Sequence, residues 1–172
     1  MLKQINNGIF VFFVSIIYSL IEIEMEGKNG WCTHLPTAKN VISTFTLYHL
    51  LMMALIVLIF YQLFHKKDVW IIIFYITMFF FIEDLLWFVL NPYFTIRKYS
   101  GKNIPWHSKW LWGQPIENYV CYFLVFLTYF KTKYKKEQMN SFIYILLLIA
   151  ITISLAPFYH LLYIKLHGKL QY

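Results

Sequence analysis

The chain has 172 residues, of which 60% are hydrophobic and only 13% are charged. A soluble domain carries about 25% charged residues, so this composition excludes an ordinary soluble domain and a disordered chain and indicates an integral membrane protein. The formal net charge is +7, but the lysines are scattered between apolar runs, so we expect no nucleic-acid partner.

Five apolar stretches predict five helices. Each is close to the length of about 20 residues that a membrane span needs, and the apolar residues run on without the alternation of a β-barrel strand. The predicted helices cover residues 8–26, 41–64, 69–90, 115–130 and 141–164. No small-residue cleavage site follows the first stretch, so we expect it to be retained. The fold class is therefore all-α, a single integral membrane bundle of five transmembrane helices over residues 1–172.

The connections between these helices differ in length and composition. Residues 65–68 make a tight hairpin and residues 131–140 a second polar connection, whereas residues 25–40 and 91–114 are longer and rich in Trp, Pro, Gly and His. Seven cations lie on the side of the short connections, and eight are spread over more than twice as many residues on the other side. This density predicts a cytoplasmic N-terminus and an extracytoplasmic C-terminus in the cell membrane.

Unusual polar and aromatic residues gather at the side of the long loops. Glu22, Glu24 and Glu26 close the first helix, Glu117 begins the fourth, and His34 and His107 lie in the loops. Five of the six tryptophans also belong to this side, namely Trp31, Trp87, Trp106, Trp110 and Trp112. The opposite side offers mainly lysines. The asymmetry predicts that any functional site lies at the end with the long loops.

Depth along the helices singles out three residues. At a rise of about 1.5 Å per residue, Glu83 and Asp84 lie roughly 10 Å inside the third helix and His49 lies roughly 12 Å inside the second. An ionised Asp in the middle of a bilayer costs about 2.5–3.5 kcal/mol, so such a residue normally faces the bundle interior and has a partner. We expect His49 to be that partner.

The first helix carries a polar stripe. Ser15, Ser19, Glu22 and Glu26 follow one another at spacings of four, three and four residues, which places them on one face of a helix. We expect this face to turn toward the bundle interior.

The candidate site comprises His49, Glu83, Asp84, His107 and Glu117. Imidazole and carboxylate groups can bind a divalent metal, although the chain has no HExxH-type ligand pair. A buried carboxyl group can also act as a general acid on an apolar substrate, as in the isomerisation or cyclisation of a lipid. A proton or ion relay is the third option, and the nearly pure hydrocarbon of the opposite helix halves argues against it.

Several runs resemble a family of small prokaryotic multi-pass membrane proteins. The resemblance extends through the fourth helix and is carried by residues 21–31, Leu35–Thr37, Tyr48–His49, Glu83–Pro92, Ile104–His107 and Trp110. It implies a multi-pass architecture and no particular activity.

A shorter run, Gly113–Tyr119, is similar to the Pro-x-Glu-Glu motif that enters a helix in membrane-embedded lycopene cyclases. Those enzymes use carboxylates to protonate and cyclise a polyene, so the resemblance implies that Glu117 is an acid. The second acid of the motif is replaced by Asn118.

The leading hypothesis from sequence is an enzyme that acts on a lipid or isoprenoid, with Glu83 or Asp84 as acid and base and His49 as the orienting partner. The alternative is a non-catalytic membrane component that binds a lipid, a metal or a partner protein through the aromatic loops. Membrane lipids are the expected surroundings in both cases. The sequence leaves open the cofactor, the substrate and the oligomeric state.

Overall fold

The computed structural model describes residues 6–28, 30, 40–42, 45–104, 106–107 and 109–168. Trp31 and His34 lie outside the described residues. Within the described part the chain forms five α-helices, which are α1 (Asn7–Glu26), α2 (Leu47–Phe64), α3 (Val69–Leu90), α4 (Ile116–Lys131) and α5 (Lys135–His167). Two short antiparallel strand pairs are also present: β1 (Asn40–Ile42) with β2 (Phe45–Thr46), and β3 (Trp110–Leu111) with β4 (Gln114–Pro115). A single 3-10 turn covers Ile96–Lys98.

Four of the described helices, α1, α2, α3 and α5, are long and apolar enough to cross a membrane. α4 has 16 residues, which gives it a length of about 24 Å against a hydrocarbon core of about 30 Å. The all-α prediction therefore holds for the described residues. Length and composition support a span for four of the five predicted helices.

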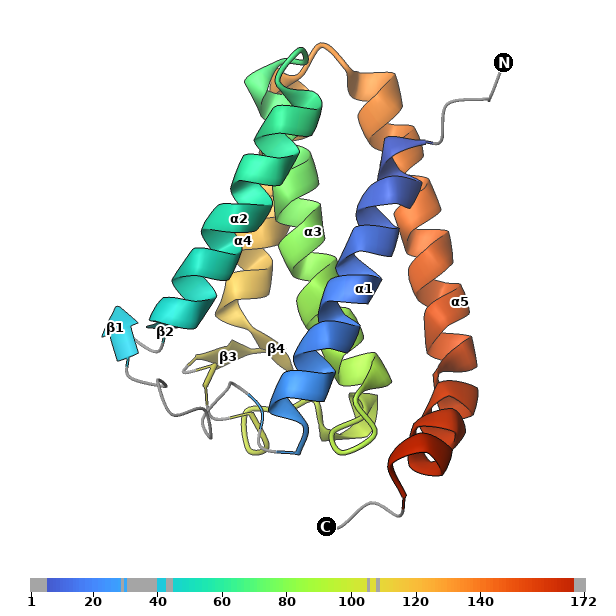
Figure 1. Cartoon of the computed structure of the whole chain (residues 1–172). Helices are drawn as coiled ribbons and strands as arrows, with labels where there is room; N and C mark the ends of the chain where they lie inside the picture. The colour runs from blue at the N-terminus through green and yellow to red at the C-terminus, as the bar shows by residue number, and fades with distance from the viewer. Residues whose placement is uncertain are drawn as a thin grey trace.

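The helices run alternately up and down (Figure 1). The start of α1 lies at the same end as the connections at residues 65–68 and 132–134, which we call the connector end. The end of α1, the two strand pairs, residues 91–115 and the end of α5 lie toward the opposite end, which we call the loop end. The described parts of the two long connections therefore lie at the loop end, as the sequence predicts.

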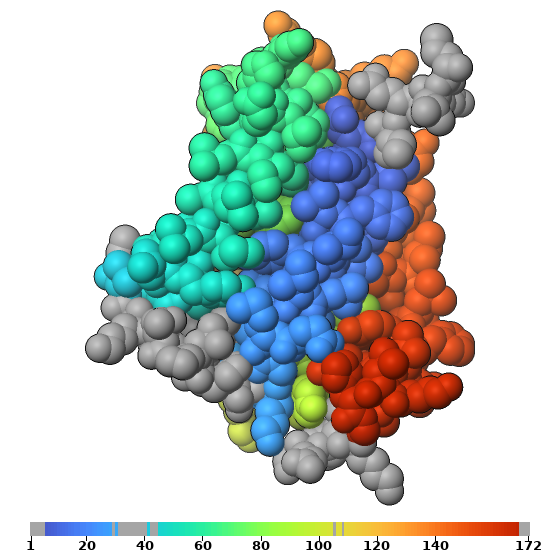
Figure 2. Space-filling model, viewed as in Figure 1, coloured from blue at the N-terminus to red at the C-terminus, as the bar shows by residue number. Residues whose placement is uncertain are grey.

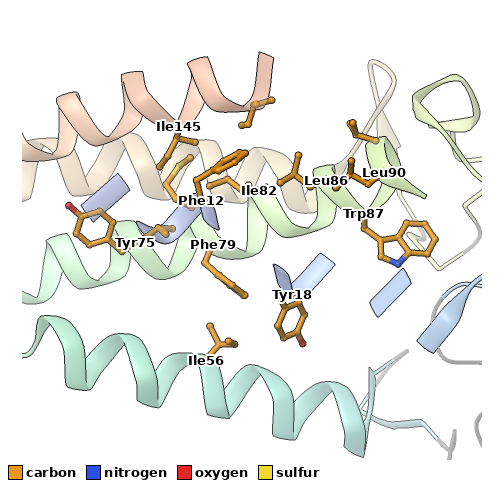
Figure 3. Close-up of a cluster of buried hydrophobic side chains, with 14 of the residues drawn as sticks. Phe12, Tyr18, Ile56, Tyr75, Phe79, Ile82, Leu86, Trp87, Leu90 and Ile145 are labelled. Carbon is orange, nitrogen blue, oxygen red and sulfur yellow. The ribbon is translucent and has the colours of Figure 1, made fainter. Parts of the chain in front are cut away.

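α3 is the central helix, because it packs against each of the other four described helices, α1, α2, α4 and α5. Its Phe79 ring is fully buried and meets the rings of Tyr18 from α1 and Phe60 from α2 edge-on, at centroid distances of 5.4 Å each. Figure 3 shows Phe79 pointing from α3 toward Ile56 of α2. In the space-filling view, α1 lies across the front of the bundle and hides much of α3 (Figure 2).

α1 and α5 approach each other closely at Gly8. A Cβ atom at this position would lie 2.6 Å from the backbone Cα of Ser141. Small residues allow helix backbones to come together in this way in membrane proteins, where dispersion contacts replace the hydrophobic effect as the cause of packing.

Polar side chains join the helices at the connector end. The Glu137 carboxylate accepts hydrogen bonds of 2.7 Å from Asn7 Nδ2, Lys67 Nζ and the Tyr75 hydroxyl. Asp68 caps α3 through the backbone N–H of Ile71 at 2.9 Å and also accepts a bond from the Thr132 hydroxyl. These contacts tie both short connections to the helices they join.

The structure corrects the predicted start of the second helix. Residues 41–46 were predicted to be helical, but β1 and β2 occupy most of this segment and α2 begins at Leu47. The segment contains Val, Ile, Thr and Phe, which favour extended backbone. The Thr46 hydroxyl accepts a hydrogen bond from the backbone N–H of His49 and acts as the N-cap that starts the helix.

The fifth helix is longer than predicted, from Lys135 to His167 in place of residues 141–164. The added residues include Lys, Glu and Gln, which form helices well but fall outside any apolar run. The other predicted boundaries, 8–26, 69–90 and 115–130, agree with α1, α3 and α4 to within one residue. Pro157 lies inside α5.

Candidate functional site

A cavity of about 220 Å³ opens between the helices at the loop end. All five predicted site residues line it, namely His49, Glu83, Asp84, His107 and Glu117. Glu22 and Glu26 line it as well, so five of the eight acidic residues of the chain meet at this one place. Most of the acidic residues of this positively charged chain therefore lie in one cavity.

α1 supplies one wall of the cavity with Tyr18, Glu22 and Glu26, which are spaced four residues apart and share one face of the helix. Ser19 fixes this face against α3, because its hydroxyl donates a 2.9 Å hydrogen bond to the backbone carbonyl of Glu83. Ser19 and Glu26 are buried, which confirms that the polar stripe on the first helix turns inward.

The carboxyl groups of Glu22, on α1, and Glu83, on α3, both line the cavity and lie close enough to interact electrostatically. Tyr18 lines the same cavity. Two carboxylates this close repel each other unless a proton lies between them. The geometry therefore suits a carboxyl pair that holds one proton, which is a different partner for Glu83 from the predicted His49.

His107 lies between two acids. Its ring nitrogens are 3.7 Å from Asp84 Oδ1 and 3.6 Å from Glu117 Oε2. The indole N–H of Trp110 donates a 2.9 Å hydrogen bond to the His107 carbonyl and so fixes this part of the loop. Burial alone lowers the pKa of His107, but the two neighbouring carboxylates outweigh it and raise the pKa above its usual value. Asp84 is thus partnered by His107.

His49 lies nearer the end of its helix than predicted. It is the third residue of α2, and Nδ1 lies 2.7 Å from the Thr46 hydroxyl in a capping box. Its ring also meets Phe45 and Tyr48 edge-on, at 6.1 Å and 5.3 Å. The estimate of about 12 Å of depth fails because it counted residues 41–46 as helix, whereas α2 begins at Leu47. His49 still lines the cavity and is buried.

The remaining walls are aromatic and aliphatic. Trp87 meets Trp106 edge-on at 6.1 Å, and Phe88 stacks on Trp106 with an angle of 9° between the rings. Other apolar groups also line the cavity: Phe45, Met53, Phe80 and Phe81. A few polar groups within a mostly apolar wall are typical of a small-molecule binding site.

Several polar and aromatic residues at the loop end do not line the cavity. His160 Nε2 is 3.0 Å from the carbonyl of Val89, where it joins α5 to α3. His167 Nε2 is 3.3 Å from Glu24, which is half exposed. Trp112 is 86% exposed at the turn between β3 and β4. None of these four side chains, from His160, His167, Glu24 and Trp112, is among the described residues that line the cavity.

The sequence prediction left Glu22 and Glu26 out of the site, although it placed both residues on the inward-facing stripe of the first helix. The inward stripe that continues from Ser15 and Ser19 was the signal that could have placed them in the cavity. Tyr18 and Asn118 also line the cavity and were not predicted.

The described residues contain no group of three or more His, Cys, Asp or Glu side chains arranged to hold a metal ion. No protein-family model, curated protein or solved structure matches the chain.

Proposed function

We propose that this protein is an enzyme of the cell membrane that protonates a lipid-like substrate, with Glu83 as the acid. The observation that supports this function best is the convergence of five carboxyl groups and two histidines in one cavity with aromatic walls. Acid catalysis needs a proton donor held close to an apolar substrate and shielded from water.

The Glu22–Glu83 pair supplies the proton in this mechanism. Glu83 donates it to one carbon of a substrate double bond, forming a C–H bond and leaving a cation at the neighbouring carbon. The faces of Trp87 and Trp106 stabilise that cation through their π electrons. A carboxylate such as Asp84 then removes a proton from an adjacent carbon, so the double bond moves and no oxidant or reductant is needed.

The histidines have positioning roles in this proposal. His107 holds Asp84 and Glu117 in the cavity wall, at 3.7 Å and 3.6 Å from its ring nitrogens. His49 orients the start of α2 through Thr46 and so shapes the wall that faces α1. Loss of either residue is expected to weaken turnover less than loss of Glu83.

An isoprenoid is the favoured class of substrate. The similarity of Gly113–Tyr119 to lycopene cyclases supports this class, and Glu117 of that run lines the cavity. The density of lysines near the connector end supports an orientation with that end in the cytoplasm, so the cavity would open on the extracytoplasmic side.

The test uses deuterium, because a carboxyl proton exchanges with solvent and a C–H bond does not. Purified protein is reconstituted with polyprenyl and other unsaturated lipids in buffered D₂O, and the extracted lipids are analysed by mass spectrometry. Wild type is expected to produce at least one lipid with deuterium bound to carbon. Glu83→Gln, which keeps the shape of the side chain, is expected to reduce incorporation on the order of 100-fold or more.

Glu24→Gln is the matched control, because Glu24 belongs to the same helix as Glu22, is half exposed and does not line the cavity. It is expected to incorporate deuterium at the wild-type rate. Incorporation by Glu83→Gln at that same rate would eliminate the acid role of Glu83.

A non-catalytic binding function is the second candidate. The exposed Trp112, on a turn with a positive φ of 46°, favours it because such a side chain suits contact with a partner or a lipid surface. This candidate predicts that no lipid gains deuterium and that Trp112→Ala impairs the cellular function while Glu83→Gln preserves it.

A further inference from the structure

A second cavity of about 540 Å³ lies between α3, α4 and α5. Its lining is almost entirely apolar: Phe74, Met78, Phe81, Cys121, Tyr122, Val125, Phe126, Tyr129, Phe130, Gln138, Met139, Phe142 and Leu146. The volume falls within the range of about 300–1,000 Å³ that is typical of ligand pockets. Nothing in the proposed acid chemistry uses this second cavity.

The two cavities share a wall. Phe81 of α3 and Cys121 of α4 line both of them. Along α4 the lining changes from Glu117 and Asn118, which face the acidic cavity, to Val125 and residues beyond it, which face the apolar cavity. Polar and apolar halves therefore follow one another along one helix.

Gln138 is a polar residue in the lining of the apolar cavity, and its Oε1 atom is buried with no hydrogen-bond partner among the described residues. Gln138 Nε2 donates hydrogen bonds to the Val125 carbonyl at 3.1 Å and to the Thr128 hydroxyl at 3.0 Å. A polar ligand group placed beside the aromatic rings of this cavity would lose its hydrogen bonds, whereas a hydrocarbon chain has none to lose and gains dispersion contacts. The lining of the apolar cavity therefore favours a hydrocarbon chain as the bound group.

We infer that the two cavities form one binding site for a single-chain amphipathic molecule, with a proton-accepting or cationic head in the acidic cavity and the hydrocarbon tail in the apolar cavity. This inference rests on the proposed function only in naming the substrate class, since binding requires no catalysis. The carboxyl groups favour such a head, and the adjacency of the two cavities at Phe81 and Cys121 favours a head and tail that belong to one molecule.

Two amines with the same head test the role of the tail. N,N-dimethyldodecylamine and N,N-dimethylbutylamine are titrated into the purified full-length protein in detergent micelles, with empty micelles as the blank, and binding is measured by calorimetry. At a fixed micelle concentration the dodecyl amine is expected to bind at least about 100-fold more tightly than the butyl amine, because each buried CH₂ adds to the affinity.

Val125→Trp fills the apolar cavity and leaves the acidic one unchanged, because Val125 lines only the former among the described residues. It is expected to weaken dodecyl amine binding about 10-fold or more and to change butyl amine binding by less than about 2-fold. Val120→Trp is the matched control, since Val120 is on the same helix, is 56% exposed and lines neither cavity.

Cys121 gives an independent readout at the junction. In a Cys32→Ser background Cys121 is the one remaining cysteine of the two in the sequence, and its reaction with a maleimide can be followed by mass spectrometry. The dodecyl amine is expected to slow this reaction at least about 5-fold at saturation, because a chain that passes from one cavity to the other covers the thiol.

Three results would overturn the inference: no binding of either amine, equal dodecyl binding by wild type and Val125→Trp, or loss of dodecyl binding in Val120→Trp as well. Chain-length-dependent binding together with a negative deuterium experiment would leave the binding site standing and remove the catalytic proposal. The two proposals can therefore fail separately.

Discussion

Glu137 is the residue whose loss should weaken the connector end most. Its carboxylate accepts hydrogen bonds from Asn7 of α1, from Lys67 in the α2–α3 connection and from Tyr75 of α3. Glu137→Ala removes the acceptor of all three bonds at once. Four parts of the chain, counting α5 itself, then lose their common contact.

The magnitude follows from the type of each bond. Bonds from the neutral donors Asn7 and Tyr75 to a carboxylate contribute about 1.5–3 kcal/mol each. Tyr75 keeps its 3.1 Å contact with the Ser141 hydroxyl, so its loss falls at the low end of that range. The Lys67 pair is about one-quarter exposed on both sides and contributes at most about 1 kcal/mol. We expect a total of about 3 kcal/mol, or on the order of 100-fold in the unfolding equilibrium.

Unfolding in mixed micelles of a mild detergent and SDS, followed by circular dichroism, measures this change. Glu24→Ala serves as the control, because Glu24 has one partner at 3.3 Å and is half exposed, so a loss below about 1 kcal/mol is expected. Equal destabilisation by Glu137→Ala and Glu24→Ala would refute the reasoning that buried convergent bonds dominate at this end.

Two further substitutions test other parts of the structure. Because the folded pKa of His107 is raised, its contribution to stability is complete below its ordinary value of about 6.5 and is lost as pH rises through the folded value. Raising the pH through this window should therefore lower the Tm of wild type more than the Tm of His107→Gln. The variant His65→Gln, which replaces an exposed histidine, should show the same pH dependence of Tm as wild type. Gly8→Ala places a Cβ atom 2.6 Å from Ser141 Cα and should cost about 1–3 kcal/mol of stability in the same unfolding assay. The control is Ile17→Ala, which truncates an exposed side chain on α1. A loss of stability in Gly8→Ala no larger than that in Ile17→Ala would argue against tight packing at Gly8.

Sequence patterns predicted both ends of α1 and α3 to within one residue. Each of these helices is a continuous apolar run bounded by polar residues, which mark where the helix begins and ends. The start of α2 was wrong because hydropathy treats Val41 and Ile42 alike in a strand and in a helix. The early start of α5 was missed because a helix that extends beyond hydrocarbon carries no apolar signal.

The sequence predicted the level of the site residues along the helices better than it predicted which residues contact one another. Counting residues along α3 placed Glu83 and Asp84 at one level, and both line the cavity. The pairing of Glu83 with Glu22 depends on how α1 rotates against α3, and the position of His107 depends on a loop of many residues. The apolar cavity between α3, α4 and α5 depends on the spacing of helices, which no local pattern encodes.

The length of α5 has a consequence for how the bundle would sit in a bilayer. Its 33 residues extend about 50 Å, against about 40–45 Å for a bilayer with its headgroups, so both ends reach the polar layers. Lys135 begins the helix and His167, which contacts Glu24, ends it. Glu22 would then lie about 3 Å below the level of that contact. In the proposed mechanism, water in the headgroup layer would return a proton to the Glu22–Glu83 pair. The lipid-like substrate would enter the cavity from the acyl-chain region of the bilayer.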